Sequence, residues 1–248
     1  MLIHVIRGYK NRFCVSPDYQ NTHSKNTFFK ANLMLAQNIY LSWRKKPNET
    51  RLIVGKINRN EIGNGIVFAY TEELEQAQKE GFSYVMGLKE VKRLSPIEIE
   101  NQLSYRIVSK SKANRNEILR FWEAENREDI FDLLALTQGR SPTDSFEFLA
   151  DFSESTEKHF KFVTDVASLS HLNIPSNFVK EGDILSYKHE KDNQTDKNAI
   201  ALYKDESKVG YIKRIHNRLF VSKKDLNLTV KSITANGVIK AMYVTVES

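Results

Sequence analysis

The sequence predicts an α+β protein with two parts. Residues 1–157 are expected to form a small antiparallel sheet followed by helices, and residues 158–248 a small β-barrel with short helices. Two observations support this division. Segments of β-branched and aromatic residues alternate with turn-forming residues in both parts, whereas helical spacing is confined to the first part. Residues 151–158 are polar and acidic, the composition most typical of a linker in this chain.

Length and composition limit the class of protein. The 248 residues are 40% hydrophobic and 27% charged, a composition typical of folded domains. No stretch approaches the roughly 20 apolar residues of a membrane span, and the first residues are too few for a signal peptide. The single cysteine, Cys14, can form neither an internal disulfide nor a thiolate zinc site. We therefore expect a cytoplasmic protein that contacts no membrane and holds no cofactor.

The elements of the first part follow from local patterns. Residues 28–39 have loose helical spacing and predict a helix. Strands are predicted at 38–43, 51–57 and 66–70, separated by turn-forming residues. Thr71 is expected to cap a short helix that has an acidic first turn and ends at Gly81. Further helices are predicted at 97–102, 116–125 and 129–136, the last closed near Gly139.

The second part is predicted to consist mostly of strands. Apolar and polar residues alternate at 161–166, 184–189, 199–203, 208–212, 226–234 and 239–246, with turn-forming residues between them. Several short strands at regular spacing predict an OB-like barrel, because closure of a sheet removes its edges.

Basic residues gather near the C-terminus. The net charge is +6, from 37 Lys and Arg against 31 Asp and Glu. Residues 208–240 hold eight basic residues and one acid, Asp225. Such a cluster suits phosphate binding, because each neutralised phosphate releases counterions. From charge alone, a solvated face is the more common explanation.

A motif in the second part is more specific. Residues 190–202 hold an acid, an Asn and then Asp-x-Asn-Ala-Ile at a strand start, from Asp196 to Ile200. One hairpin later, Gly210 opens the run Gly-Tyr-Ile-Lys-Arg. This pair, with a Gly-Asp turn upstream, resembles the HIRAN domain of helicase-like transcription factors and small bacterial proteins. Without the resemblance, the Asp and Asn residues are explained as side chains that fold a tight turn.

The resemblance implies an OB-like barrel that binds single-stranded DNA, in the best-known members at a free 3′ end. It implies that Asp196 contacts the terminal nucleotide. The family's stacking aromatic beside that aspartate is Thr195 here, and a second aromatic falls at Phe160 or Phe162. Loss of one stacked base would weaken binding by roughly ten- to a hundredfold. Tyr211 is explained equally well as a rim residue of the barrel. The candidate nucleic-acid-binding residues are Phe162, Asp196, Lys197, Tyr211, Lys213, Arg214 and Arg218.

Residues 38–150 resemble the N-terminal subdomain of HipA-type toxin kinases, which is not their catalytic part. The similarity rests on the order of the strands and on residues 129–140, where Phe131 and two leucines precede Gly139 and Arg140. A protein partner that docks on this part belongs to the protein-interaction hypothesis given below. The alternative is that Phe131 and the leucines are the core of a helix, which needs no family resemblance.

No catalytic arrangement is apparent. The six histidines have no metal-binding spacing, and neither a glycine-rich phosphate loop nor a nucleophile elbow is present. We therefore expect a non-enzymatic protein that binds nucleic acid, as single-stranded DNA or DNA ends. A protein-interaction module of a DNA-repair or toxin–antitoxin-like system is the second hypothesis. A metal-dependent nuclease using Asp183, Asp192 and Asp196 is the third.

Overall fold

The computed structural model describes residues 34–46, 49–60, 65–84 and 92–248, which lie in one compact unit that begins at Leu33. Its helices and antiparallel sheets confirm the α+β class. The helix predicted at 28–39 begins outside the described residues. For the residues that are described, the helix prediction is wrong, because residues 34–37 are not helical and a strand starts at Asn38. No helix in the described ranges is both long enough and apolar enough to cross a membrane.

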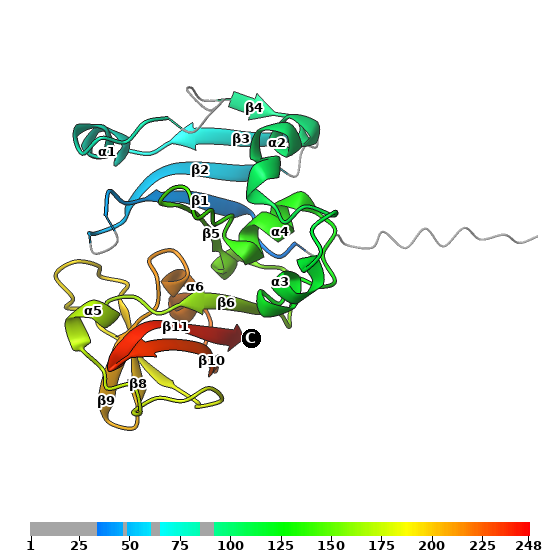
Figure 1. Cartoon of the computed structure of the whole chain (residues 1–248). Helices are drawn as coiled ribbons and strands as arrows, with labels where there is room; N and C mark the ends of the chain where they lie inside the picture. The colour runs from blue at the N-terminus through cyan, green and yellow to red at the C-terminus, as the bar shows by residue number, and fades with distance from the viewer. Residues whose placement is uncertain (1–33, 47–48, 61–64, 85–91) are drawn as a thin grey trace, which may run out of the picture. The chain divides into compact units, whose positions relative to one another are not determined.

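The first part is built on a five-stranded antiparallel sheet (Figure 1). Its strand order is β4-β3-β2-β1-β5. The strands are β1 (Asn38–Trp43), β2 (Leu52–Asn60), β3 (Gly65–Tyr70), β4 (Lys92–Leu94) and β5 (Phe146–Asp151). The three strands predicted here are confirmed. Strand β5 was not predicted. It is covered on both faces, and its buried acids Glu147 and Asp151 interrupt the apolar run by which such a strand is usually recognised.

Helices connect and cover this sheet. They are α1 (Leu74–Lys79), α2 (Pro96–Leu103), α3 (Arg115–Phe121) and α4 (Ile130–Thr137), with a 3₁₀ turn at Ser104–Arg106. Ser95 and Glu98 form a capping box before α2, and the Asp129 carboxylate accepts from the Asp132 N–H at the start of α4. The expected Thr71 cap is wrong: its hydroxyl donates to the Ile53 carbonyl and ties the loop to β2.

The second part contains two three-stranded sheets, β10-β11-β6 and β7-β8-β9. Their strands are β6 (Lys161–Asp165), β7 (Ser186–His189), β8 (Ile200–Lys204), β9 (Ser207–Tyr211), β10 (Asn227–Asn236) and β11 (Val238–Glu247). The six strands predicted here are confirmed to within a few residues. The short helices α5 (Leu169–Leu172) and α6 (Asn217–Ser222) lie between them.

The two sheets are linked to each other at both of their edges, and the OB-like barrel expected from the sequence stays a prediction. Isolated β-bridges, Ala167 to Tyr211 and Ile184 to Thr229, join the edges of the two sheets instead of continuous ladders. The strand edges of the two sheets, which would otherwise be left unpaired, are therefore linked to each other by these bridges.

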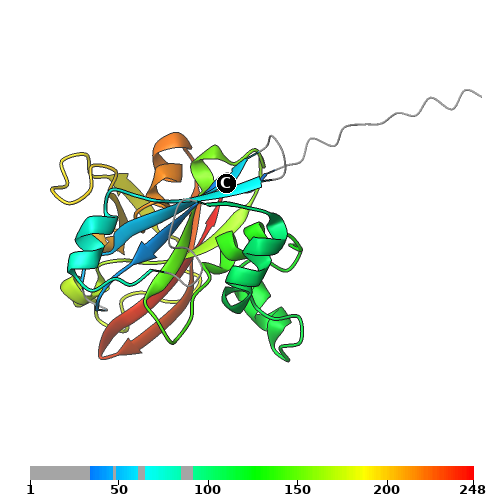
Figure 2. The ribbon, with the colours of Figure 1, turned by 90° about the horizontal axis from the view of Figure 1, so that it is seen from above.

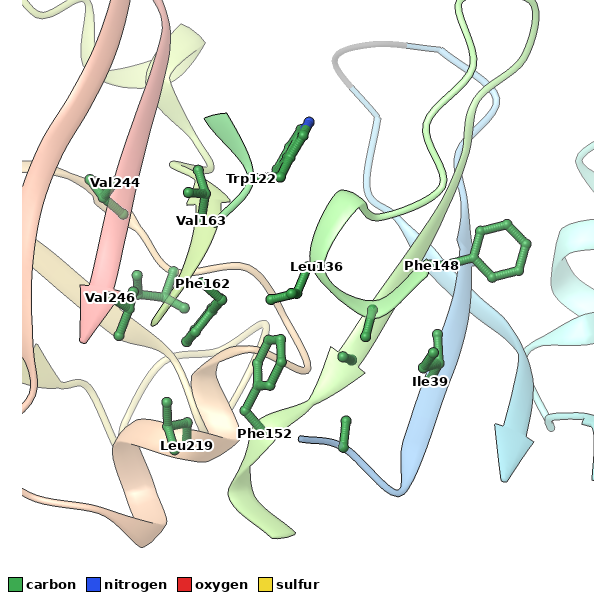
Figure 3. Close-up of a cluster of buried hydrophobic side chains, with 14 of the residues drawn as sticks. Ile39, Trp122, Leu136, Phe148, Phe152, Phe162, Val163, Leu219, Val244 and Val246 are labelled. Carbon is green, nitrogen blue, oxygen red and sulfur yellow. The ribbon is translucent and has the colours of Figure 1, made fainter. Parts of the chain in front are cut away.

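A shared apolar core joins the two predicted parts (Figure 3). Phe152, from the first part, lies with its ring centroid 4.1 Å from that of Phe162 on β6. Leu136 of α4 also points toward this pair, and all three side chains are buried. The predicted linker 151–158 is therefore partly buried: Asp151 and Phe152 are 3% and 1% exposed, whereas Glu154, Thr156 and Lys158 are exposed. A division at residue 158 stays a prediction, but the chain packs across it.

Gly210 lies where the two sheets of the second part are linked, next to the bridge from Ala167 to Tyr211. Its φ is +143°, and an added Cβ would lie 2.1 Å from Val166 Cγ1 and 2.9 Å from the Ala167 carbonyl oxygen. Ala167 is the residue that bridges to Tyr211, with a 2.8 Å hydrogen bond from its N–H. Only glycine fits here without displacing that bridge.

We expect Gly210→Ala to lower the free energy of unfolding by about 3 kcal/mol or more, because strain at positive φ and overpacking add. Gly237→Ala is the matched control: φ is +70° there, but nothing lies within 4 Å of the added Cβ. Its cost is only the conformational strain, about 1 kcal/mol. Urea unfolding of both variants measures the difference, and equal losses would contradict the packing argument.

Candidate nucleic-acid interface

The sheet β7-β8-β9 presents a face with aromatic and basic side chains. We call this face, made of Lys188, Tyr203, Lys208 and Tyr211, the outer sheet face. Register places Tyr203 opposite Lys208, and both Lys188 and Tyr211 opposite Ala201, so that the four side chains share one side. The alternate residues Leu202 and Val209 are buried.

The cations of the outer sheet face lie over its rings. Lys188 Nζ is 4.9 Å from the ring centroid of Tyr203, and Lys208 Nζ is 5.0 Å from that of Tyr211. Lys188 is exposed, and the other three side chains are partly exposed. Aromatic rings beside ammonium groups are the combination with which proteins hold single-stranded nucleic acid, by base stacking and phosphate attraction.

Glu190 fixes one end of this face. Its carboxylate accepts a 2.9 Å hydrogen bond from the Tyr211 hydroxyl and a 2.5 Å bond from Lys208 Nζ. These bonds, chiefly that from Lys208, lower the pKa of Glu190, and the same contact raises the pKa of Lys208. The pair therefore stays ionised, holds the tyrosine ring in place and leaves Lys208 with little free charge.

The loop before β8 is a turn built by its own polar side chains. Asn193 Oδ1 accepts from the N–H groups of Thr195 and Asp196, at 3.0 and 3.1 Å. The carboxylate of Asp196 accepts from the Asn198 N–H at 2.9 Å and from Asn217 Nδ2 at 2.7 Å. Both of its oxygens are thus engaged, as the turn-forming interpretation predicts.

Lys197 lies in the same turn. Its side chain is exposed, and its backbone carbonyl oxygen lies 2.9 Å from His189 Nε2 at the end of β7. The turn therefore places one solvated cation at the edge of the sheet that carries the outer sheet face.

The assignment of Phe162 to the surface is wrong. Its side chain is 1% exposed and packs between Phe152 and His216. The face of β6 that carries it is covered by the segment that follows β5, so the ring cannot stack on a base.

The assignment of Lys213 as a phosphate contact is also wrong. Its side chain is 6% exposed, and Nζ lies 2.6 Å from Glu147 Oε2 and forms a second ion pair with Asp165. It also donates to Gln138 Oε1 at 3.2 Å. Burial lowers the pKa of Lys213 to about 8, an effect that the two carboxylates oppose.

Lys213 belongs to a buried charge cluster, which we define as Arg51, Arg140, Glu147, Asp165 and Lys213. Arg140 reaches Glu147 at 2.7 Å and Asp165 at 2.6 Å, and Arg51 reaches Glu147 at 2.6 Å. Burial alone would raise the pKa of both carboxylates, but the charges of Lys213 and Arg140 hold them below their ordinary values. The only sign of this cluster in the sequence is the presence of acids within apolar strands.

Arg214 and Arg218 are held by acids of the first part. Arg214 is paired with Glu73 at 2.5 Å and is half exposed. Arg218 is paired with Asp151 at 2.7 Å and donates to the Tyr40 hydroxyl at 2.8 Å. The basic run after β9 thus faces the first part of the chain and lies apart from the outer sheet face.

Of the predicted site residues, the structure brings only Tyr211 to the outer sheet face, with Asp196 and Lys197 in the loop before β8. Sequence reasoning missed Lys188, Tyr203 and Glu190 as members of the site. The signal was present, because the strand register that aligns Tyr211 also aligns these side chains.

The acids proposed for a nuclease do not converge on a metal site. Asp183 pairs with Lys204 Nζ at 2.5 Å, whereas Asp196 is bonded to Asn217. In the part of the chain that is described, no three His, Cys, Asp or Glu side chains gather in a group that could hold a metal ion.

Comparison with known proteins assigns the second part. Residues 159–235 match the family model described as the HIRAN domain. This segment is a HIRAN domain. A solved structure, the HIRAN domain of human HLTF, aligns with 36% of this chain and 75% of its own, at 16% identity and a TM-score of 0.29. No curated protein matches the sequence. The HipA-like assignment of residues 38–150 stays a prediction.

His216 lies in the HIRAN domain beside the buried charge cluster. Its Nδ1 is 2.8 Å from Thr164 Oγ1, and Nε2 is buried without a hydrogen-bond partner in the described structure. Burial, reinforced by the charge of Lys213, lowers the pKa of His216 to about 3. The folded protein therefore holds a neutral imidazole at every pH near neutrality.

Because the unfolded chain takes up this proton near pH 6.5 and the folded chain only near pH 3, stability falls as pH drops between these values. The slope from one such group is up to about 1.4 kcal/mol per pH unit. We expect His216→Leu to reduce the slope by about that amount, measured by urea unfolding from about pH 7 to about pH 4.5. His171→Leu, at an exposed position on α5, is the control. Identical slopes in wild type and His216→Leu would refute the assignment.

Proposed function

We propose that this chain binds nucleic acid through its HIRAN domain, at the outer sheet face, and does so without catalysis. The HIRAN match over residues 159–235 carries the proposal, because this family is generally DNA-binding. The geometry supports it independently, since two tyrosine rings and two lysines lie on one accessible sheet face.

A single strand fits this face better than a duplex. Each ring of Tyr203 and Tyr211 offers a surface on which one base can stack, at about 1–3 kcal/mol per base. Bases inside a duplex are already stacked and cannot reach the rings. The two rings are fixed by cations and by the Glu190 hydrogen bond, so little side-chain entropy is lost on binding.

We propose binding along the strand rather than at its 3′ end. An end-binding role would require a free acceptor on Asp196, and both of its oxygens already accept hydrogen bonds from the chain. The adjacent position is Thr195, which offers no ring for a terminal base. Oligonucleotides with a free or a phosphorylated 3′ end should then bind with equal affinity.

Lys188 is expected to be the main phosphate contact of the face, because Lys208 is neutralised by Glu190. Fluorescence anisotropy with a labelled single strand across a salt series should give a linear log–log dependence on salt. Lys188→Ala should reduce its slope by about 0.7, the contribution of one phosphate on a single strand. Lys240→Ala, an exposed lysine on β11, should leave the slope unchanged. Absence of salt-dependent binding to any oligonucleotide would reject the proposal in favour of a protein-interaction module.

Tyr211 tests the stacking component. Tyr211→Ala should weaken single-strand binding by roughly tenfold or more at constant salt slope, because it removes a ring and no charge. Tyr211→Phe keeps the ring and loses only the hydroxyl, which donates to Glu190 and accepts from Lys208, so its affinity should stay within a few-fold of wild type. Circular dichroism checks that both variants are folded. If the two lose affinity equally, the hydroxyl and not the ring makes the contact.

A further inference from the structure

We propose that Asn236 is a site of spontaneous covalent modification, at which its side-chain amide becomes a carboxylate through a cyclic imide formed with Gly237. These two residues lie at the turn between β10 and β11, where the register places Ala235 opposite Ile239. Asparagine is one of the chemically less stable residues in proteins, and glycine as its successor offers the least steric hindrance to ring closure. The turn lies outside the outer sheet face, so its chemistry does not depend on nucleic-acid binding.

The dipeptide alone does not identify a reactive site. Asn-Gly is favoured in hairpin turns for conformational reasons, because both residues tolerate a positive φ, and Gly237 has a φ of +70°. The surroundings of the turn carry the proposal instead. Asn236 and Gly237 are both exposed to the water that the reaction consumes. Figures 1 and 2 show the turn at the end of β10 and β11 that lies farthest from the marked C-terminus.

The main-chain nitrogen of Gly237 is free to react. Within the described ranges its N–H donates no hydrogen bond, although its carbonyl oxygen accepts one from the Ser176 N–H at 3.0 Å. An amide that is already hydrogen-bonded would have to give up that bond before it could lose its proton. A Cβ built on Gly237 would have no atom within 4 Å, so there is open space around the position where the ring must close.

The reaction needs water and a base, and no oxidant or reductant. The Gly237 nitrogen loses its proton to hydroxide and attacks the side-chain carbonyl carbon, Cγ, of Asn236. A bond from this nitrogen to Cγ forms, the bond from Cγ to Nδ2 breaks, and the Nδ2 group takes up a proton from water and leaves as ammonia. Water then opens the five-membered imide. Cleavage at Cγ gives aspartate, and cleavage at the main-chain carbonyl gives isoaspartate.

Asn198 provides a comparison within the same chain. It is also exposed, but the residue after it, Ala199, carries a Cβ, and the Ala199 N–H donates to the Asp196 carbonyl at 2.9 Å. Both steric hindrance and this hydrogen bond oppose ring closure there. Asn236 should therefore be modified while Asn198 stays intact.

The modification has a structural consequence because the turn is tied to the segment after α5. Besides the bond from the Ser176 N–H to the Gly237 carbonyl, Pro175 forms a β-bridge with Val238. Aspartate adds a negative charge but keeps the main chain. Isoaspartate lengthens the main chain by one methylene immediately before Gly237, which displaces the carbonyl oxygen that Ser176 needs.

The test is incubation of the full chain at mildly alkaline pH, followed by mass spectrometry of its peptides. We expect the peptide that holds Asn236 to gain one mass unit severalfold faster than the peptide that holds Asn198. The rate should rise with pH, since the attacking nitrogen must lose a proton. Gly237→Ala, a substitution for which the fold has room, should slow the gain severalfold because its Cβ hinders ring closure.

The products separate this route from direct hydrolysis of the amide, which gives aspartate alone. Both aspartate and isoaspartate should appear at position 236. Aspartate as the sole product, equal rates at Asn236 and Asn198, or an unchanged rate in Gly237→Ala would overturn the proposal.

Hydrogen exchange measures the consequence for the fold. In the incubated chain, the fraction of Ser176 N–H groups that lose protection should match the isoaspartate fraction. Asn236→Asp is the control, because it carries the new charge on an unaltered main chain and should keep that protection. Full protection in the isoaspartate form would overturn the structural part of the proposal. None of these measurements involves an oligonucleotide, so failure of the outer sheet face to bind nucleic acid leaves them unaffected.

Discussion

The burial of Lys213 is the constraint on which the arrangement of the HIRAN domain depends. An ammonium group at 6% exposure is tolerated only with carboxylates beside it, and one of these, Glu147, comes from β5 of the first part. Removal of residues 34–157 would leave Lys213 without that partner and would expose Phe162, which packs on Phe152. The HIRAN domain of this chain therefore relies on the preceding sheet for both charge compensation and apolar contact.

That dependence also decides where a polyanion can bind. The basic residues that follow β9 are the most obvious phosphate contacts in the sequence, yet Lys213, Arg214 and Arg218 each meet an acid from the first part. Carboxylates of the chain occupy the positions that phosphates would take. A nucleic acid competing there would have to displace buried or partly buried ion pairs, whereas Lys188 on the outer sheet face has no acidic partner in the described ranges.

The elements of the HIRAN domain are predictable from the sequence because they depend on local patterns. Period-two alternation locates all six strands, and the motif from Asp196 to Ile200 together with the run from Gly210 to Arg214 indicates the family. The site is less predictable because burial depends on distant residues. Lys213 and Lys208 look equivalent in the sequence, but Lys213 meets a carboxylate 66 residues away and Lys208 one only 18 residues away. A local sequence pattern cannot predict which face of a sheet is covered by a segment that is distant in the sequence.

Charge compensation therefore separates binding residues from structural ones better than charge density does. The segment from 208 to 240 is the most basic of the chain, and most of the cations that it places near the first part are neutralised there. Lys188 lies outside this segment, yet it is exposed beside the Tyr203 ring and has no acidic partner within the described structure. An unpaired cation retains its full attraction for phosphate, whereas a paired one must first lose a carboxylate. Anion recognition in this protein is thus expected where the fold leaves positive charge uncompensated, rather than where the sequence concentrates it.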